Sequence, residues 1–283
     1  MINIDAEIYS EFKCKADKCK HSCCKGWEID IDEDTLLYYK SLDAELGNEI
    51  RQNIHEGEDT FFKLTDDKKC PFLKDDGLCK IIEELGEDAL CDICRLHPRF
   101  FVEINDYSLA GVGLSCEKAS ELLFEKKSLN FIICDSQKTI SFQELLKMLE
   151  IDISQDYLNL TNIIPQYLDE AKIKKILDIF CITEPIDSNW KNEVLLIKRY
   201  YKEYLNNLDI KKYEFIYQYI LFRQLELTLN HGIKKIIDYA VYSIIFIMLY
   251  ERLYHDDIEA VRRWSEQIEY NEDNIEIILN EVG

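Results

Sequence analysis

Apolar residues recur every three or four positions through most of the second half of the chain, which is the spacing of one helix face. The pattern predicts helices over residues 190–208 and 213–220. Gly232 separates the second of these from a strongly apolar stretch that runs to about Tyr254. A long helix that is apolar on all its faces is typical of the centre of a helical bundle. We therefore expect a bundle whose central helix follows Gly232.

The first half of the chain has shorter apolar runs, which turn-forming residues interrupt. Residues 61–64 and Phe100–Ile104 are runs of the kind that form short strands. We expect a helix over residues 34–46 that Gly47 ends, and a short helix over Ile81–Leu85. The predicted fold class is mainly α, with an irregular cysteine-rich metal-binding N-terminal part of short helices and strands packed on a C-terminal helical bundle.

The use of cysteine changes along the chain. Ten of the eleven cysteines precede Ser136, and only Cys181 follows it. This shift predicts two domains, a cysteine-rich metal- or cluster-binding domain over residues 1–135 and an α-helical bundle domain over residues 136–283.

Composition narrows the range of partners. The 283 residues include 55 Asp and Glu against 34 Lys and Arg, which gives a formal net charge of −21. Such a charge repels nucleic acid and anionic membrane surfaces, so we expect neither as a partner. The stretch 197–235 departs from this balance, with eight Lys and Arg against four acids. It indicates either a surface for an acidic partner protein or a solvated helix face.

The chain has no pattern of a secretory signal or a membrane helix. Its first residues lack a cationic segment followed by an apolar one. The longest apolar run, Tyr239–Tyr250, has 12 residues, whereas a membrane helix needs ~20. We therefore expect a cytoplasmic protein. In a reducing compartment, clustered cysteines more often bind metals or carry redox chemistry than form disulfides.

The cysteines are the main chemical signal. Nine of the eleven lie between Cys14 and Cys116, and four occur within eleven residues in the pattern C-x4-C-x3-C-C-x-G-W, which ends at Trp27. Thiolates are soft ligands, and their distribution fits one metal ion or cluster held from several loops. For any single cysteine, an inert buried thiol is the alternative.

The order of these motifs resembles the flagellin lysine N-methylase family, which belongs with a broader group of cysteine-rich, zinc- or iron-chelating proteins. The resemblance rests on four segments: Phe12–Asp32 (F-x-C-x4-C-x3-C-C-x-G-W-x-I-x-I-D), Cys70–Cys79 (C-P-F-L-x-x-D-G-L-C), Cys94–Arg99 (C-R-x-x-P-R) and Ser115-Cys116. It covers roughly residues 10–125, and Tyr219–Arg223 matches a helix of the family more weakly.

The resemblance implies transfer of a methyl group from S-adenosylmethionine to lysine ε-amines of flagellin, with a four-iron four-sulfur (4Fe-4S) cluster as a cofactor. Position by position, it carries over to eight candidate metal ligands: Cys14, Cys19, Cys23, Cys24, Cys70, Cys79, Cys94 and Cys116. One cubane cluster needs four ligands, so the choice among the eight stays open. Cys91, Cys134 and Cys181 lie outside the matched positions.

Residues that could hold S-adenosylmethionine flank the cysteines. The chain offers no Gly-rich phosphate-type loop, because Gly111-Val112-Gly113 is too short a match. We therefore place the cofactor at the cluster, where Arg95 or Arg99 could pair with its carboxylate and Trp27 could stack on its adenine. The alternatives are that the arginines neutralise thiolate charge and that Trp27 keeps water from the cluster.

The catalytic residues are not identified by the sequence. Ten of the 17 tyrosines fall between Tyr200 and Tyr254 and could line a lysine slot, although tyrosines at helical spacing are more often bundle core. His97 stands where the family has Tyr, and Glu117-Lys118 replaces its Pro-Glu. The alternative function is a non-catalytic zinc- or iron-binding interaction module, because thiolates serve both kinds of centre.

Overall fold

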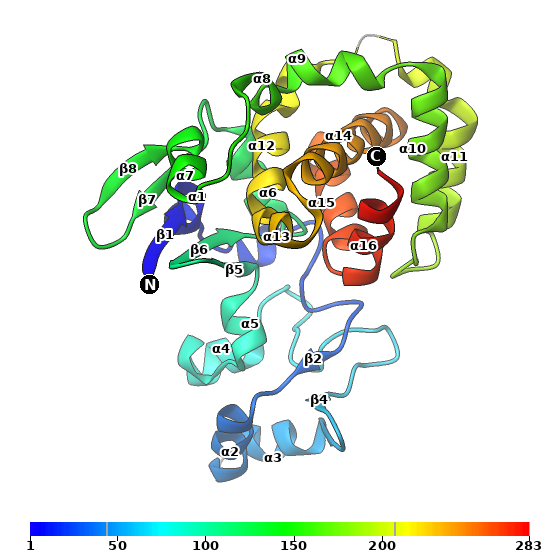
Figure 1. The fold of residues 1–283 in the computed structure, drawn as a ribbon. Helices are drawn as coiled ribbons and strands as arrows, with labels where there is room; N and C mark the ends of the chain where they lie inside the picture. The colour runs from blue at the N-terminus through cyan, green and yellow to red at the C-terminus, as the bar shows by residue number, and fades with distance from the viewer. Residues whose placement is uncertain (44, 207, 283) are drawn as a thin grey trace. The chain divides into compact units, whose positions relative to one another are not determined.

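The computed structural model describes residues 1–43, 45–206 and 208–282. It is 57% helical, so the fold is mainly α, as predicted. The chain divides into two compact units (Figure 1): unit 1 comprises Met1–Phe12 and Pro98–Gly283, and unit 2 comprises Lys13–His97. Within the described ranges, none of the helices combines the length and the hydrophobicity that a membrane crossing requires.

Unit 1 contains a five-stranded sheet of strand order β5-β6-β1-β7-β8. Strand β1 runs parallel to β6, and the other neighbours are antiparallel. The strands are β1 (Ile2–Ala6), β5 (Arg99–Ile104), β6 (Tyr107–Val112), β7 (Asn130–Ile133) and β8 (Lys138–Ser141). The strand predicted over Phe100–Ile104 is thus confirmed, within β5.

The structure divides the chain differently from the predicted boundary at residue 135. That boundary falls inside a hairpin, because β7 and β8 pair from Asn130↔Ser141 to Ile133↔Lys138. Residues 1–12 and 98–135 lie in the same unit as the helices. The predicted boundary followed the distribution of cysteines along the chain. The units of the structure depend instead on packing, and strand pairing joins segments that are far apart in sequence.

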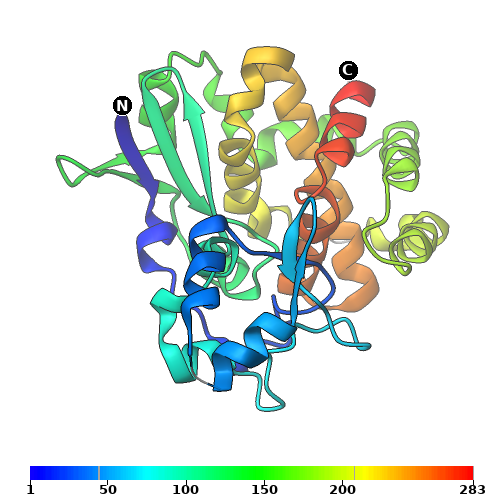
Figure 2. The ribbon, with the colours of Figure 1, turned by 90° about the horizontal axis from the view of Figure 1, so that it is seen from below.

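The helices of unit 1 occupy most of the rest of the chain. They are α1 (Glu7–Glu11), α6 (Glu117–Phe124), α7 (Phe142–Met148), α8 (Gln155–Leu158), α9 (Leu160–Ile163), α10 (Glu170–Ile182), α11 (Trp190–Tyr204), α12 (Glu214–Arg223), α13 (Thr228–His231), α14 (Ile233–Tyr254), α15 (Asp257–Ile268) and α16 (Glu272–Glu281). Short 3₁₀ turns are η3 (Ile164–Tyr167), η4 (Ile210–Tyr213) and η5 (Leu225–Leu227). Figures 1 and 2 place α12, α14 and α15 to one side of the sheet.

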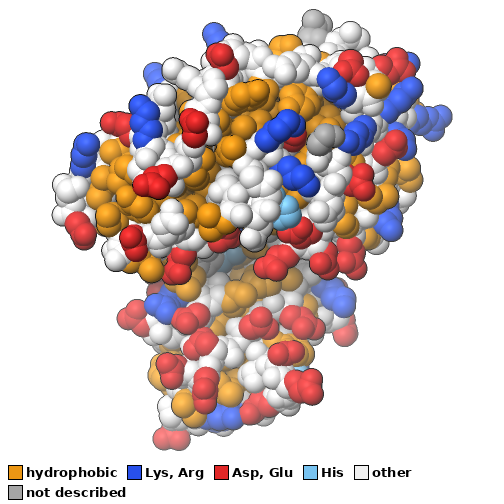
Figure 3. Space-filling view, in the orientation of Figure 1, with side chains coloured by type: hydrophobic (Ala, Val, Ile, Leu, Met, Phe, Trp, Pro, Cys, Tyr) orange, Lys and Arg blue, Asp and Glu red, His pale blue; other side chains and the backbone are white. Residues whose placement is uncertain are grey.

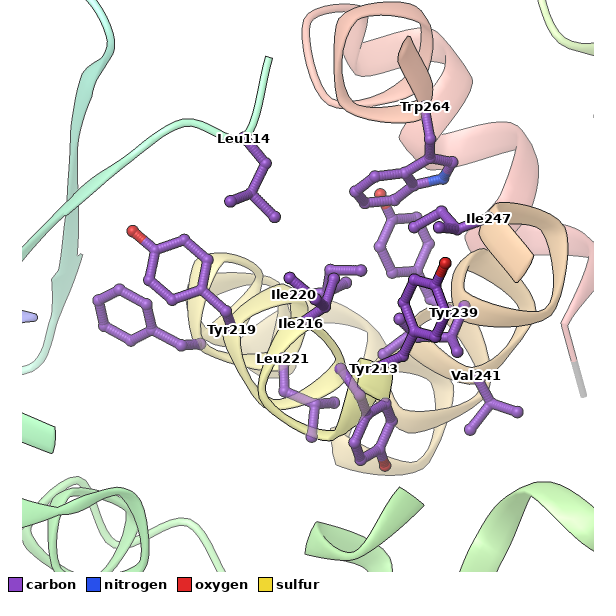
Figure 4. Close-up of a cluster of buried hydrophobic side chains, with 14 of the residues drawn as sticks. Leu114, Tyr213, Ile216, Tyr219, Ile220, Leu221, Tyr239, Val241, Ile247 and Trp264 are labelled. Carbon is purple, nitrogen blue, oxygen red and sulfur yellow. The ribbon is translucent and has the colours of Figure 1, made fainter. Parts of the chain in front are cut away.

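Helix α14 is the central helix predicted after Gly232. Every residue from 236 to 250 is buried, and α10, α11, α12, α15 and α16 all contact it. Phe246 of α14 stacks on Phe180 of α10, with ring centroids 4.0 Å apart. Figure 4 shows side chains of α12, such as Ile216 and Ile220, beside Tyr239 of α14 and Trp264 of α15. An all-round apolar helix therefore forms the core against which the others pack.

Unit 2 is built from short elements around a second, smaller apolar core. Its three-stranded sheet has the order β2-β4-β3. The elements are η1 (Ala16–Lys18), β2 (Ile29–Asp30), α2 (Glu33–Ser41), α3 (Glu45–Gln52), β3 (Ile54–Glu56), β4 (Thr60–Phe62), α4 (Lys80–Leu85), η2 (Glu87–Ala89) and α5 (Asp92–Leu96). The helix expected over Ile81–Leu85 is confirmed as α4, and Gly86 follows it with a positive φ of 89°.

The single helix predicted over residues 34–46 is wrong. Helix α2 ends at Ser41, and α3 begins at Glu45; Ala44, within the predicted range, lies outside the described residues. Gly47 lies inside α3 rather than after a helix, and a Cβ there would be 2.5 Å from the carbonyl oxygen of Leu42. The glycine therefore allows α3 to approach the end of α2 closely, whereas the sequence predicted that it ends a helix.

Candidate functional site

Five cysteines gather around the core of unit 2. Cys70 and Cys91 are buried, and Cys24, Cys79 and Cys94 are half-buried against the same apolar cluster. No disulfide joins any of the chain's cysteines, all of which lie among the described residues. Four of the five were predicted as metal ligands. Cys91 was not, because it lies outside the matched motif positions.

Backbone contacts bring these thiols together. The amide of Cys70 donates to the carbonyl of Cys24 (2.8 Å), which joins the first cysteine segment to the second. Leu73 and Cys79 form a bridge across a turn whose Gly77 has φ 83°. Cys79 and Cys91 directly precede α4 and α5, and Cys94 lies within α5. Loop segments distant in sequence thus meet at one face of the small core.

Asp32 holds α5 in place. Its carboxylate accepts hydrogen bonds from the amide of Thr35 at the start of α2 (2.9 Å) and from the amide of Asp92 at the start of α5 (2.8 Å). Burial tends to raise the pKa of Asp32, but these backbone hydrogen bonds outweigh it and hold the pKa below its usual value. One side chain therefore caps two helices and fixes the segment that carries Cys91 and Cys94.

The thiols shift one another's pKa values, some upward and some downward. Burial raises the pKa of Cys70 to about 12, and neighbouring thiols add to the rise. The pKa of Cys24 falls to about 7, chiefly because its sulfur hydrogen-bonds with Cys23. The hydrogen bond between Cys91 and Cys94 lowers the pKa of the first and raises that of the second. A cation among these sulfurs would favour the thiolate form of all of them.

The chemistry of this donor set fits a thiolate-bound metal centre, because five soft ligands share one partly dry region. As the side chains stand, however, the described part of the chain contains no group of three or more His, Cys, Asp or Glu residues placed to hold a metal ion. The sulfurs are gathered but are not arranged as a coordination sphere.

The other predicted ligands are not part of this buried group, although Cys23 hydrogen-bonds with Cys24. Cys14 and Cys23 are exposed in unit 2, and Cys19 is half-buried there. Cys116 belongs to unit 1, where it directly precedes α6. The density of thiols near the N-terminus therefore did not identify which of them enter the apolar core.

The three residues predicted to hold S-adenosylmethionine do not converge within one unit. Arg95 is exposed and forms an ion pair with Asp92. Trp27 donates from its indole nitrogen to the carbonyl of Cys23 (2.7 Å). Arg99 lies in unit 1, with its guanidinium over the ring of Phe12 at 5.5 Å. Their role in binding the cofactor stays a prediction.

Unit 1 holds a buried ion pair that sequence reasoning missed. Arg223 Nε, at the end of α12, lies 3.2 Å from Glu269 Oε1, just after α15, and their side chains are 13% and 0% exposed. The rings of Phe100 and Tyr270 flank the guanidinium at 4.6 and 5.5 Å. Arg223 Nη1 has no hydrogen-bond partner among the described residues. Glu269 is too deeply buried to contact a protein substrate directly. The ion pair has a structural role, because it joins the end of α12 to the end of α15.

The segment Gly111-Val112-Gly113 has a packing role beside this pair. A Cβ on Gly111 would lie 2.7 Å from the hydroxyl of Tyr219, and one on Gly113 would lie 2.6 Å from that of Tyr270. The Tyr219 hydroxyl accepts a hydrogen bond from Val112 N (2.7 Å) and donates one to Val112 O (2.9 Å). In the sequence, the weak resemblance at Tyr219–Arg223 pointed to this region, whereas Gly111-Val112-Gly113 was considered only as a phosphate-type loop.

Comparison with known proteins decides the family. Flagellar biosynthetic protein FliU of Salmonella muenchen is 31% identical to the chain over 121 residues, which are 39% of this chain and 70% of FliU. The chain belongs to the flagellin lysine N-methylase family. Proteins named lysine-N-methylase from Salmonella typhimurium and Salmonella choleraesuis are each 26% identical over 198 residues, or 66% of this chain.

This family member spans 70% of the length of FliU but only 43% of the length of the two lysine-N-methylases. No protein-family model matches the chain. No solved structure matches it either. The activity and substrate of the longer relatives therefore enter below as proposals.

The basic stretch of this family member is largely neutralised. Five of its eight Lys and Arg side chains pair with carboxylates outside the stretch: Lys198–Asp178, Lys202–Glu170, Lys212–Asp257, Arg223–Glu269 and Lys234–Asp238. On the face drawn in Figure 3, Lys and Arg side chains stand among Asp and Glu side chains. These pairs favour a solvated helix face over a surface for an acidic partner.

Proposed function

We propose that the protein is an S-adenosylmethionine-dependent protein-lysine N-methyltransferase that acts on flagellin. The observation that carries the proposal is the similarity to FliU and to proteins named lysine-N-methylase. The family relation supports methyl transfer in general. The cofactor and the substrate are the finer part of the proposal.

We further propose that the five gathered thiols hold a 4Fe-4S cluster. Cys24, Cys70, Cys79, Cys91 and Cys94 exceed by one the four ligands that a cubane needs. When bound, the cluster supplies iron sites that can take the nitrogen and oxygen atoms of a small molecule. The chain's own part is to keep the sulfurs in an apolar surrounding, which limits the access of water.

Methyl transfer to lysine also needs a proton acceptor. A lysine ammonium has a pKa of ~10.4 and becomes a nucleophile only after it loses a proton. Carboxylates in dry surroundings are stronger bases than exposed ones, and burial raises the pKa values of Glu214, Glu226 and Glu269 in unit 1. Of these three, Glu214 lines a groove large enough for a substrate segment.

The proposal is tested by purifying the full chain under anaerobic conditions and measuring iron, zinc and acid-labile sulfide beside methyl transfer to flagellin. We expect iron and sulfide, and transfer that Cys91→Ser and Cys94→Ser abolish. Cys181→Ser is the matched control, because Cys181 belongs to unit 1, whereas the five gathered cysteines belong to unit 2. Stoichiometric zinc without sulfide or transfer would instead favour the non-catalytic module.

A further inference from the structure

A groove of about 540 Å³ opens on unit 1. Its lining comes from the segment that leads into β7, the end of β8 and the start of α7, helices α8 and α9, and the first half of α12. The volume lies within the range of about 300–1,000 Å³ that is usual for ligand sites. None of the five gathered cysteines lines the groove, because all its lining residues belong to unit 1.

The groove is lined mainly by carboxamides above an apolar floor. Leu129, Phe142 and Leu158 are buried beneath it. Six amide side chains stand around them: Asn130, Gln143, Gln155, Asn159, Asn162 and Gln218. A carboxamide offers both a donor and an acceptor, as a peptide group does. Four of the six amides use one polar atom in a hydrogen bond within the protein, and the remaining amide atoms can serve an extended polypeptide backbone as donors and acceptors.

The charged groups of the groove favour a cation. Asp156 and Glu214 line it, against Lys127 as its one cationic side chain, and neither carboxylate forms an ion pair within the described part of the chain. Both oxygens of Glu214 accept from the amide of Leu160 at 3.1 Å, which fixes the carboxylate in the wall. The net charge of −21 adds a long-range attraction for basic segments.

We propose that this groove binds an extended, lysine-bearing segment of the protein substrate, with its amides hydrogen-bonded to the backbone and with Asp156 and Glu214 facing the lysine ammonium. The proposal rests on the proposed lysine methylation and gives it a docking site. The class of ligand is set by two features together, the amide-rich lining and two carboxylates that hydrogen bonds hold in place but that form no ion pair among the described residues.

The test measures binding of a fluorescent, capped peptide of Ser, Asn and Thr residues with one central Lys to the full chain. The comparison peptide has Gln in place of that Lys. The variant is Asp156→Asn with Glu214→Gln, in which the Gln oxygen can still accept from Leu160. The matched control is Asp152→Asn with Glu150→Gln, which removes the same charge from exposed residues outside the groove.

We expect the Lys peptide to bind about fivefold more weakly to the groove variant than to the wild type, because two charge contacts are lost. The control variant should bind as the wild type does. The idea is overturned if the wild type binds the Gln peptide as tightly as the Lys peptide, if it binds neither, or if the groove variant is unaffected. Unchanged melting temperatures establish that the variants are folded.

The outcome is separable from that of the proposed function. If the Lys peptide binds with the expected dependence on the carboxylates but flagellin receives no methyl group, the groove stands and methyl transfer fails. If flagellin is methylated and the groove variant leaves its KM unchanged, methyl transfer stands and the groove is excluded. A raised KM for flagellin in the groove variant would support both, and a lower kcat would be consistent with the loss of Glu214 as a proton acceptor.

Discussion

Replacing Tyr219 by Phe removes one hydroxyl that ties the end of strand β6 to helix α12. That hydroxyl makes two buried hydrogen bonds, at 2.7 Å from Val112 N and 2.9 Å to Val112 O. Each contributes about 1 kcal/mol net, and loss of a partner leaves buried backbone groups that cost about 1–3 kcal/mol. We expect Tyr219→Phe to lower the free energy of unfolding of unit 1 by about 2–3 kcal/mol.

The assay is urea unfolding followed by tryptophan fluorescence. A Trp27→Phe background leaves Trp190 and Trp264, which are both buried in unit 1, so the signal reports on this unit alone. The matched control is Tyr213→Phe. Tyr213 is also buried, but its hydroxyl has no hydrogen-bond partner among the described residues. Its removal should leave stability unchanged or slightly raised. Equal losses in the two variants would refute the reasoning.

Three further predictions concern packing and acid stability. Gly113→Ala places a methyl group 2.6 Å from the Tyr270 hydroxyl, so urea unfolding should show a free energy of unfolding lower by about 1–3 kcal/mol. An added Tyr270→Phe should restore part of this loss, and the absence of any restoration would contradict the clash. Asp32→Ala removes two helix caps and should cost unit 2 about 1–2 kcal/mol by unfolding followed at Trp27. Because the folded pKa of Asp32 is depressed, its stabilisation is present above the unfolded pKa and is lost as pH falls through the folded one, which an acid titration of the same signal checks. Burial lowers the pKa of His97 to about 4, so stability should fall as pH drops from about 6.5 to 4, and an NMR titration midpoint near 6.5 would disprove this.

Local periodicity predicted the helices that form the core of unit 1. The break at Gly232 and the apolar run to Tyr254 reappear as α14, and the pattern after Trp190 reappears as α11. These patterns were sufficient because an apolar stripe must be buried wherever the helix packs. The break between α2 and α3 was missed, since it depends on Arg51, whose guanidinium donates to the carbonyls of Tyr39 and Leu42.

Contacts between distant segments were beyond local patterns. Strand β1 pairs with β6 and β7, about a hundred or more residues away, and this pairing moves the N-terminus into the helical unit. The ion pair of Arg223 and Glu269 likewise joins helices that no motif connects. Either partner alone resembles an ordinary surface charge in the sequence.

The cysteine motifs predicted only four of the five cysteines that gather around the core of unit 2. Cys24, Cys70, Cys79 and Cys94 gather as expected from their order in the chain. Cys91 joins them because Asp32 anchors the start of α5, a contact that spacing does not reveal. Motif positions therefore indicated the region in which cysteines gather, and burial indicated which of them enter the apolar core.

The most direct test of the central claim is peptide mass spectrometry of flagellin after incubation with the full chain, purified under anaerobic conditions, and S-adenosylmethionine carrying a deuterated methyl group. Lysine methylation by the protein predicts deuterated methyl-lysine on flagellin peptides, which is absent when the Cys91→Ser, Cys94→Ser variant replaces the wild type. Unmodified flagellin, after incubation with protein that contains its full complement of iron and sulfide, would contradict the account.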